Sequence, residues 1–201
     1  VSVAVQPQIT ISVNPDFTVC TGESINPNNY ISSPVGATIT WSNSNTNIGI
    51  GASGNGDLPT WNAGANSSGS TISGTITVSA SLNGCPGVQD VFIVNVLSAP
   101  DFTYTTSPAS GLDCITNTGV ILGVSNPANS TVSWTGPSIV SGANTLSPVV
   151  NAPGQYIVTL TDNVNGCITT DTVQIDPPTL INITSVAQNN VSCFNGSNGS
   201  I

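Results

Sequence analysis

The sequence of 201 residues contains no Lys, Arg, His or Met, and this absence excludes several classes of function. An average soluble domain of this length carries about 50 charged side chains. This chain has nine, all acidic, so no ion pair between side chains can form. Nothing in the chain can neutralise phosphates, which excludes nucleic acid and anionic membrane surfaces as partners. The charged residues are Asp16, Glu23, Asp57, Asp90, Asp101, Asp113, Asp162, Asp171 and Asp176.

Enzymatic chemistry also lacks its usual groups. Without His or Lys, only carboxylates remain as general bases. Asp16 and Asp101 recur at equivalent positions of two similar segments, as do Asp90 and Asp171, which favours turn roles over a catalytic pair across a cleft. We therefore expect no catalytic residues and no enzyme activity.

Long apolar runs are missing as well. No stretch approaches the roughly 18 residues needed to cross a bilayer, so we expect no direct membrane insertion. The first residues, VSVAVQPQITISV, alternate like a strand and do not resemble a signal peptide. Val, Ile and Thr are abundant, which predicts a folded β protein instead of a disordered chain.

What the sequence does contain is an internal repeat. NPDFTVC at 14–20 is echoed by APDFT at 99–103, and TITWSN at 38–43 is echoed by TVSWTG at 131–136. TITVSASLNGC at 75–85 is echoed by IVTLTDNVNGC at 157–167. The order Cys, Trp, Asn-Gly-Cys, strand is thus present twice, which is typical of a tandem array.

This repeat predicts the domain organisation. We expect residues 1–14 to be the last strand of a preceding repeat, 15–98 and 99–177 to be two complete repeats, and 178–201 to begin a further one. Apolar residues alternate with period 2, which places them on one face of each strand. Short strands separated by Pro, Gly and Asn predict all-β, immunoglobulin-like sandwiches in an elongated tandem array. The expected inward-facing sets are Ile39 with Trp41, Ile76 with Val78, Phe92 with Val94 and Val96, Val132 with Trp134, Val158 with Leu160, and Val173 with Ile175.

The repeated order also suggests two disulfides, one inside each repeat: Cys20 with Cys85, and Cys114 with Cys167. Cys193 would then be unpaired in this stretch. Free buried thiols are the alternative, and zinc is disfavoured because the cysteines are far apart and His is absent. Disulfides imply an oxidising, extracellular compartment.

Few residues remain as ligand-binding candidates. The segments DNVNG at 162–166 and GNGD at 54–57 could offer oxygen ligands to calcium, but plain turns explain them better, so we expect no cofactor and no metal site. Trp41 and Trp134 are expected in the cores. Trp61 has no counterpart in the second repeat and is a candidate surface contact, with packing beneath its own loop as the alternative.

The segment from VCTGESINPNNY to DVFIVNV, residues 19–96, resembles the PKD-like repeats of giant surface proteins of Bacteroidota. ITSVAQNNVSCFNGSNGSI, residues 183–201, resembles the start of an SprB repeat, named for the gliding-motility adhesin. The resemblance implies a segment of a large filamentous adhesin on the bacterial cell surface, exported by the type IX system, and a rigid shaft is the expected role. A glycan-binding module and a polymerised fibre subunit are the alternatives.

The expected partners are neighbouring repeats of the same chain and surface polysaccharide or other glycans. Asp171-Thr172-Val173 resembles the O-glycosylation signal of these bacteria, with Thr172 as the acceptor. A solvent-facing strand Thr beside an Asp is the alternative.

Overall fold

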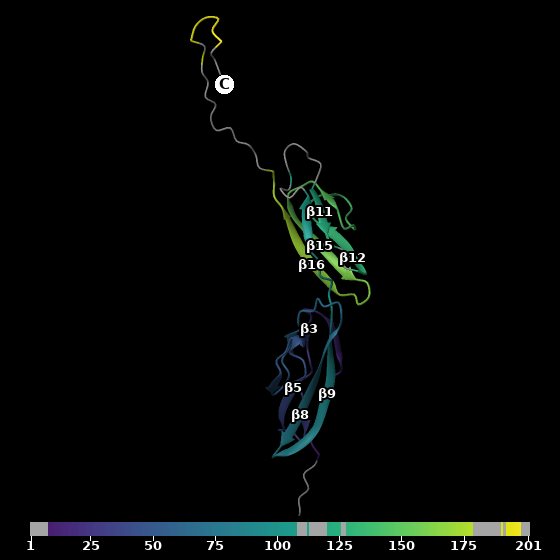
Figure 1. Cartoon of the computed structure of the whole chain (residues 1–201). Coiled ribbons are helices and arrows are strands. Elements are labelled where there is room, and N and C mark those ends of the chain that lie inside the picture. Colours follow the sequence, from purple (N-terminus) through teal and green to yellow (C-terminus); the bar gives the residue numbers. More distant parts are fainter. Residues whose placement is uncertain are drawn as a thin grey trace, which may run out of the picture.

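The computed structural model describes residues 8–107, 112, 120–125, 128–178, 190 and 192–197. The chain is all-β and forms two sandwiches that follow one another along an elongated molecule (Figure 1). Among the residues described, the single helical element is a 3₁₀ turn, Thr46–Ile48. The prediction of immunoglobulin-like sandwiches in tandem is confirmed.

The first sandwich is built around a long hairpin. Its main sheet has the order β2-β9-β8-β5-β6, in which β2 runs parallel to β9 and the other neighbours are antiparallel. Two short ladders, β1 with β4 and β3 with β7, complete it. The strands are β1 (Thr10–Ile11), β2 (Phe17–Cys20), β3 (Ser24–Ile25), β4 (Ser32–Ser33), β5 (Thr38–Asn43), β6 (Ser53–Asn55), β7 (Trp61–Asn62), β8 (Ile72–Leu82) and β9 (Cys85–Leu97).

The second sandwich is made of two antiparallel sheets, with orders β10-β11-β14-β13 and β12-β15-β16. Four strands face three, the arrangement of a constant-type immunoglobulin domain. Its strands are β10 (Tyr104–Ser107), β11 (Val120–Val124), β12 (Ser130–Thr135), β13 (Ile139–Ser141), β14 (Val149–Val150), β15 (Gly154–Asp162) and β16 (Ile168–Ile175).

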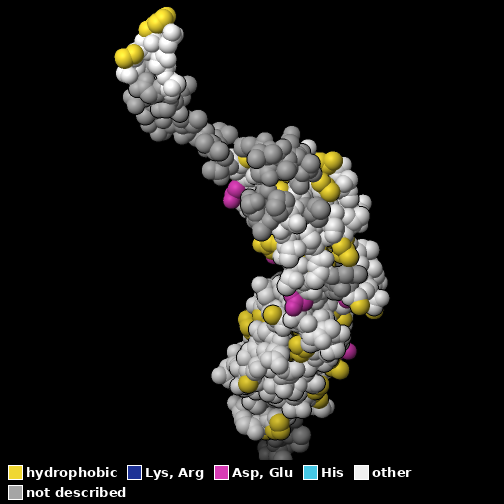
Figure 2. Space-filling view, turned by 45° about the horizontal axis from the view of Figure 1, so that its top comes forward, with side chains coloured by type: hydrophobic (Ala, Val, Ile, Leu, Met, Phe, Trp, Pro, Cys, Tyr) yellow, Lys and Arg dark blue, Asp and Glu magenta, His cyan; other side chains and the backbone are white. Residues whose placement is uncertain are grey.

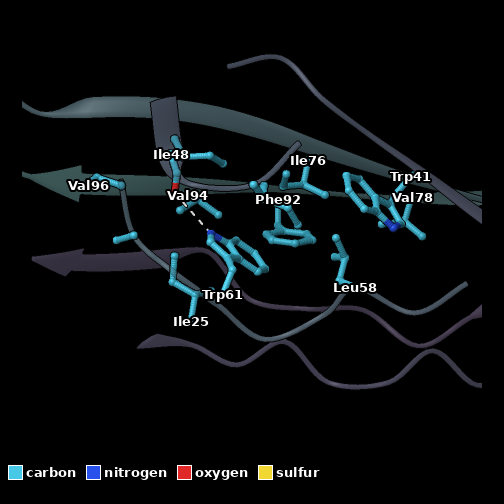
Figure 3. Packing of buried hydrophobic residues seen from close by; sticks show 12 residues of the cluster. Ile25, Trp41, Ile48, Leu58, Trp61, Ile76, Val78, Phe92, Val94 and Val96 are labelled. Carbon is cyan, nitrogen blue, oxygen red and sulfur yellow. Dashed lines mark hydrogen bonds between the residues drawn. The ribbon is translucent and has the colours of Figure 1, made fainter. Parts of the chain in front are cut away.

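Each sandwich has its own core, and the period-2 pattern predicts the inward residues. Ile76 and Val78 of β8 lie on the same face as Trp41 of β5 (Figure 3). Phe92 packs edge-on against Phe17, with ring centroids 5.8 Å apart. Trp134, Val158, Leu160, Val173 and Ile175 are buried in the second core. Ile39 and Val132 are half-buried and pack against the first and the second core, respectively.

The Asn-Gly turn closes the β8–β9 hairpin. Asn83 and Gly84 both have positive φ, 52° and 81°, which is the conformation of a two-residue turn whose twist matches the flanking strands. The corresponding turn between β15 and β16 is longer, and Gly166 there has φ 78°. Both hairpins therefore reverse at the Asn-Gly pair that the sequence indicates.

The N-terminal segment is a correction to the predicted boundaries. Thr10 and Ile11 pair with Ser33 and Ser32 of β4, and the N–H of Val88 donates to the carbonyl of Ile9 at 3.0 Å. Residues 8–14 therefore belong to the first sandwich and not to a preceding repeat. The predicted boundary at 14 was wrong because the alternation of this segment shows a strand but not which sheet it joins. Most of 178–201 lies outside the described residues.

Uncharged polar groups dominate the visible surface, with scattered carboxylates and isolated apolar side chains (Figure 2). Val35 and Val13 are among the exposed apolar residues of the first sandwich. In the part of the chain that the structure describes, no helix is long and apolar enough to span a membrane.

Candidate functional site

The junction between the two sandwiches is held by a disulfide as well as by the linker. Cys20, at the end of β2, is bonded to Cys167, which immediately precedes β16. Their Cα atoms are 5.5 Å apart, within the ordinary range for a disulfide, and the bond spans 147 residues of sequence. It joins the first sandwich covalently to the second.

This pairing overturns the predicted disulfides. Cys85 is a free, exposed thiol, and Cys167 is bonded to Cys20, so neither predicted pair exists. Cys114 lies outside the described residues. Cys193 is free and exposed.

The physical reason is the direction of β2. Because β2 runs parallel to β9, Cys20 lies opposite Leu97, at the end of β9. Cys85 begins the same strand, 13 residues long, so the two cysteines are separated by about 40 Å at 3.3 Å per residue. A disulfide needs Cα atoms within about 7 Å. The two cysteines therefore lie at opposite ends of the first sandwich, although the repeated sequence order suggested that they pair.

Hydrogen bonds hold the connecting segment on both sides. The side-chain amide of Asn165 donates to the carbonyl of Ser98 at 2.7 Å, and the hydroxyl of Thr169 donates to the carbonyl of Pro100 at 2.8 Å. On the side of the first sandwich, the N–H of Ala99 donates to the carbonyl of Asn66 at 3.1 Å. Ser98 and Ala99 are buried, so the link between the sandwiches is a packed segment.

Asn66 anchors this arrangement from the first sandwich. It is buried, and its side-chain amide donates to the carbonyls of Ser70 and Val96 at 2.9 and 2.8 Å. The hydroxyl of Ser98 accepts from the N–H of Gly69 at 3.0 Å. The loop at 66–70 thereby ties the end of β9 to the linker. A polar groove of about 530 Å³ runs beside it, with Asp101 and Asp162 as its charged side chains.

Trp61 is not a surface contact, which corrects the first of the two expectations for it. The side chain is 8% exposed and packs among Ile25, Ile48 and Phe92 (Figure 3). Its indole N–H donates to the carbonyl of Ile48 at 3.2 Å. The pairing of β7 with β3 turns the ring inward, so all three tryptophans of the chain are buried.

The carboxylates serve the backbone. Asp16 accepts from the N–H of Ile93 at 2.7 Å, Glu23 from that of Cys20 at 2.8 Å, and Asp57 from that of Tyr30 at 2.8 Å. Within the described residues, no three side chains of metal-ligating type come together.

The turn at 162–166 is organised by its own carboxylate. Asp162 accepts from the N–H groups of Val164 and Asn165 at 2.7 and 3.3 Å. This is the bonding of an Asx turn, which supports the plain-turn interpretation of DNVNG.

One buried polar cluster was not predicted. Asp90 is buried, and one carboxylate oxygen accepts from the Tyr30 hydroxyl at 2.7 Å and from the Asn14 N–H at 3.0 Å. Burial and the bond to Asp90 raise the pKa of Tyr30 far above its usual value. The sequence could have indicated the burial of Asp90, because Asp90 lies at even spacing from Phe92, Val94 and Val96 and therefore faces the same side of β9. Its repeat counterpart Asp171 is exposed.

Thr172 lies in β16, at the edge of the three-stranded sheet. Its side chain is exposed, and its N–H donates to the carboxylate of Asp171 at 2.7 Å. The position is accessible to a modifying enzyme, and it is equally that of an ordinary solvent-facing strand residue.

No protein-family model matches the chain, and no curated protein matches its sequence. Solved structures with a similar fold include the two immunoglobulin domains of DIP-gamma, at 12% identity and a TM-score of 0.35, covering 87% of this chain and 99% of that chain. Extracellular cadherin domains 1–4 of protocadherin gamma B7 match at 17% and 0.35, covering 85% and 49%. The C-terminal fragment of intimin matches at 13% and 0.32, covering 86% and 64%. These likenesses concern the fold alone.

Proposed function

We propose that this chain is a segment of the shaft of a large secreted surface adhesin, in which β-sandwiches in series hold a distal region away from the cell. The disulfide between Cys20 and Cys167 carries the proposal, because it connects adjoining sandwiches at their junction. A free linker would let the sandwiches rotate independently, whereas a second covalent connection beside the linker removes most of that freedom. The role is mechanical and not enzymatic.

The chemistry of the surface supports an extracellular position. A disulfide persists in an oxidising compartment. A chain without Lys or Arg offers trypsin-like proteases no cleavage site, and its net charge of −9 repels identical neighbours. The resemblance to PKD-like and SprB repeats suggests the bacterial cell surface, type IX export, and a part in adhesion or gliding motility.

Binding of surface glycans is the second candidate, for which the polar groove beside the linker is the favourable observation. Sugar-binding grooves commonly present exposed aromatic rings, and the residues that line this groove include no aromatic side chain. The shaft is therefore the better-supported role, with neighbouring repeats of the same polypeptide as its main partners.

Small-angle X-ray scattering tests the shaft directly. The 201-residue chain should have a radius of gyration well above the roughly 16 to 17 Å of a compact globule of this length. In Cys20→Ala the maximum dimension should remain similar while the scattering curve shows a broader range of shapes, and Cys85→Ala should behave like the parent. A compact radius for the parent chain would refute the shaft.

Cell experiments test the location and role. Antibody against the folded chain should label intact cells of the source organism, and deletion of the coding segment should reduce attachment to surfaces. Labelling confined to permeabilised cells would contradict the proposal.

A further inference from the structure

Cys85 and Cys167 occupy the same place in their two sandwiches. Each follows the Asn-Gly pair at the turn of the last hairpin, and each precedes or begins the final strand, β9 or β16. Cys167 is completely buried in its bond to Cys20 of the adjoining sandwich. Cys85 is exposed and free. The second sandwich therefore shows what a cysteine at this position does when another sandwich lies against it.

The path of the backbone supports the equivalence. The segment that enters the second sandwich crosses the start of β16, where the Thr169 hydroxyl donates to the carbonyl of Pro100. The segment that enters the first sandwich crosses the start of β9, where the N–H of Val88 donates to the carbonyl of Ile9. Gly87 is needed there, because a Cβ on it would lie 2.8 Å from the Cβ of Ile9. Both sandwiches are thus entered at the end that carries the Asn-Gly-Cys turn.

A third pair of equivalent positions, beside Cys85 and beside the existing junction, supports the same comparison. Val35 and Ala128 each precede the core tryptophan of their sandwich, Trp41 or Trp134, by six residues. Ala128 lines the groove between the two sandwiches. Val35 is 83% exposed beside β5, whose first residue pairs with Ser81 next to the β8–β9 turn. The end of the first sandwich that carries Cys85 thus exposes an apolar side chain where the second sandwich has a junction.

We propose that Cys85 forms a disulfide with another sandwich of the same kind, through the cysteine that corresponds there to Cys20, and that this sandwich is the preceding module of the same polypeptide. The inference rests on the proposed shaft and extends it: one bond of the Cys20 to Cys167 type would cross each junction. The two thiols lose two protons and two electrons as the S–S bond forms. The electron acceptor is a disulfide oxidant of the oxidising compartment, whose own S–S bond is reduced to two thiols.

Peptide mapping of the polypeptide from its natural source tests this pairing. Free thiols are alkylated under denaturing conditions, and the protein is cut on the N-terminal side of Asp without reduction. Cys20, Cys85 and Cys167 then fall on separate peptides, 16–56, 57–89 and 162–170. Peptide 57–89 should be linked to a peptide from outside residues 1–201 whose cysteine precedes a tryptophan in the repeat order. Peptides 16–56 and 162–170 should be linked to each other.

Two outcomes would overturn the proposal: alkylated Cys85, or a link from peptide 57–89 to any peptide of residues 1–201, a second copy of 57–89 included. Cys85→Ser in the same polypeptide should release one alkylatable cysteine in the preceding module, while Ser81→Ala, an exposed change beside the same turn, should release none. If Cys85 is alkylated while the link between 16–56 and 162–170 is present, the inference fails and the shaft stands. If that second link is absent as well, the junction underlying the proposed function fails.

Discussion

Removal of the disulfide between Cys20 and Cys167 should destabilise both sandwiches, although the bond lies in neither core. Cys20→Ala and Cys167→Ala delete the same connection, so their effects should be nearly equal. A bond within one sandwich would instead stabilise that sandwich alone. The perturbation therefore separates an inter-sandwich disulfide from the intra-repeat pairs that the sequence suggests.

The loop that the bond closes sets the magnitude. In the folded first sandwich Cys20 lies opposite Leu97. When only the second sandwich unfolds, the disulfide therefore closes a loop of about 70 residues, for which the chain-entropy model gives about 4.4 kcal/mol. When both sandwiches unfold, the loop is the full separation of 147 residues, equivalent to about 5 kcal/mol. When only the first sandwich unfolds, the disulfide closes a loop of similar length. The free energy of unfolding of each sandwich should therefore fall by about 4 kcal/mol without the bond.

Hydrogen exchange measured on peptides of β8 and β15 reports the two sandwiches separately. In Cys20→Ala the free energy of opening should fall by about 4 kcal/mol in both strands, and the melting temperature should fall by roughly 20 °C. Cys85→Ala is the matched control, because Cys85 is a free thiol in this chain. A loss confined to β8, or an equal loss in Cys85→Ala, would refute the inter-sandwich bond.

Four further outcomes are expected. Tyr30→Phe should cost about 2 kcal/mol in urea unfolding, because it removes a hydrogen bond to the buried carboxylate of Asp90; a change below 0.5 kcal/mol by the same measurement would show that the bond is absent in solution. Because the pKa of Tyr30 is raised above 10.0 in the folded chain, its contribution to stability should be complete below pH 10 and decline above it, and Tyr30→Phe should lack that decline; equal alkaline losses would contradict this. Trp61→Ala should cost about 3 to 5 kcal/mol through a cavity in the first core, and a surface-like loss under 1 kcal/mol would place the ring outside. Near the isoelectric point of about 4.1, copies of the chain lose the net charge that repels them, so light scattering should rise while the circular dichroism of the strands persists. Scattering that stays flat would exclude charge as the cause that keeps the copies apart.

The alternation of apolar residues was sufficient to predict the inward faces of the longer strands β8, β9, β15 and β16. Ile76, Val78, Phe92 and Val94 are buried because a pleated strand turns every second side chain to the same side, a rule that needs no knowledge of distant contacts. The same rule applies to Asp90. Its spacing from Phe92 turns its side chain toward the core, although its charge suggested the surface.

The cysteine pairing could not be derived in this way. Equivalent order in the two repeats says nothing about which end of a sandwich a residue occupies. That end depends on the direction of β2 beside β9, and β2 aligned with β9 in parallel carries Cys20 away from Cys85. Strand direction is set by pairing between residues more than 70 positions apart.

By itself, the amino-acid sequence determined that the chain is all-β, repeated, acidic and without the groups of common catalysis, because these properties follow from composition and local periodicity. The tertiary structure decided the role of individual residues: Trp61 as a core residue, residues 8–14 as part of the first sandwich, and Cys20 as the partner of Cys167. Each of these roles depends on which distant segments lie side by side. The repeat pattern is compatible with several such arrangements, and long-range packing selects one of them.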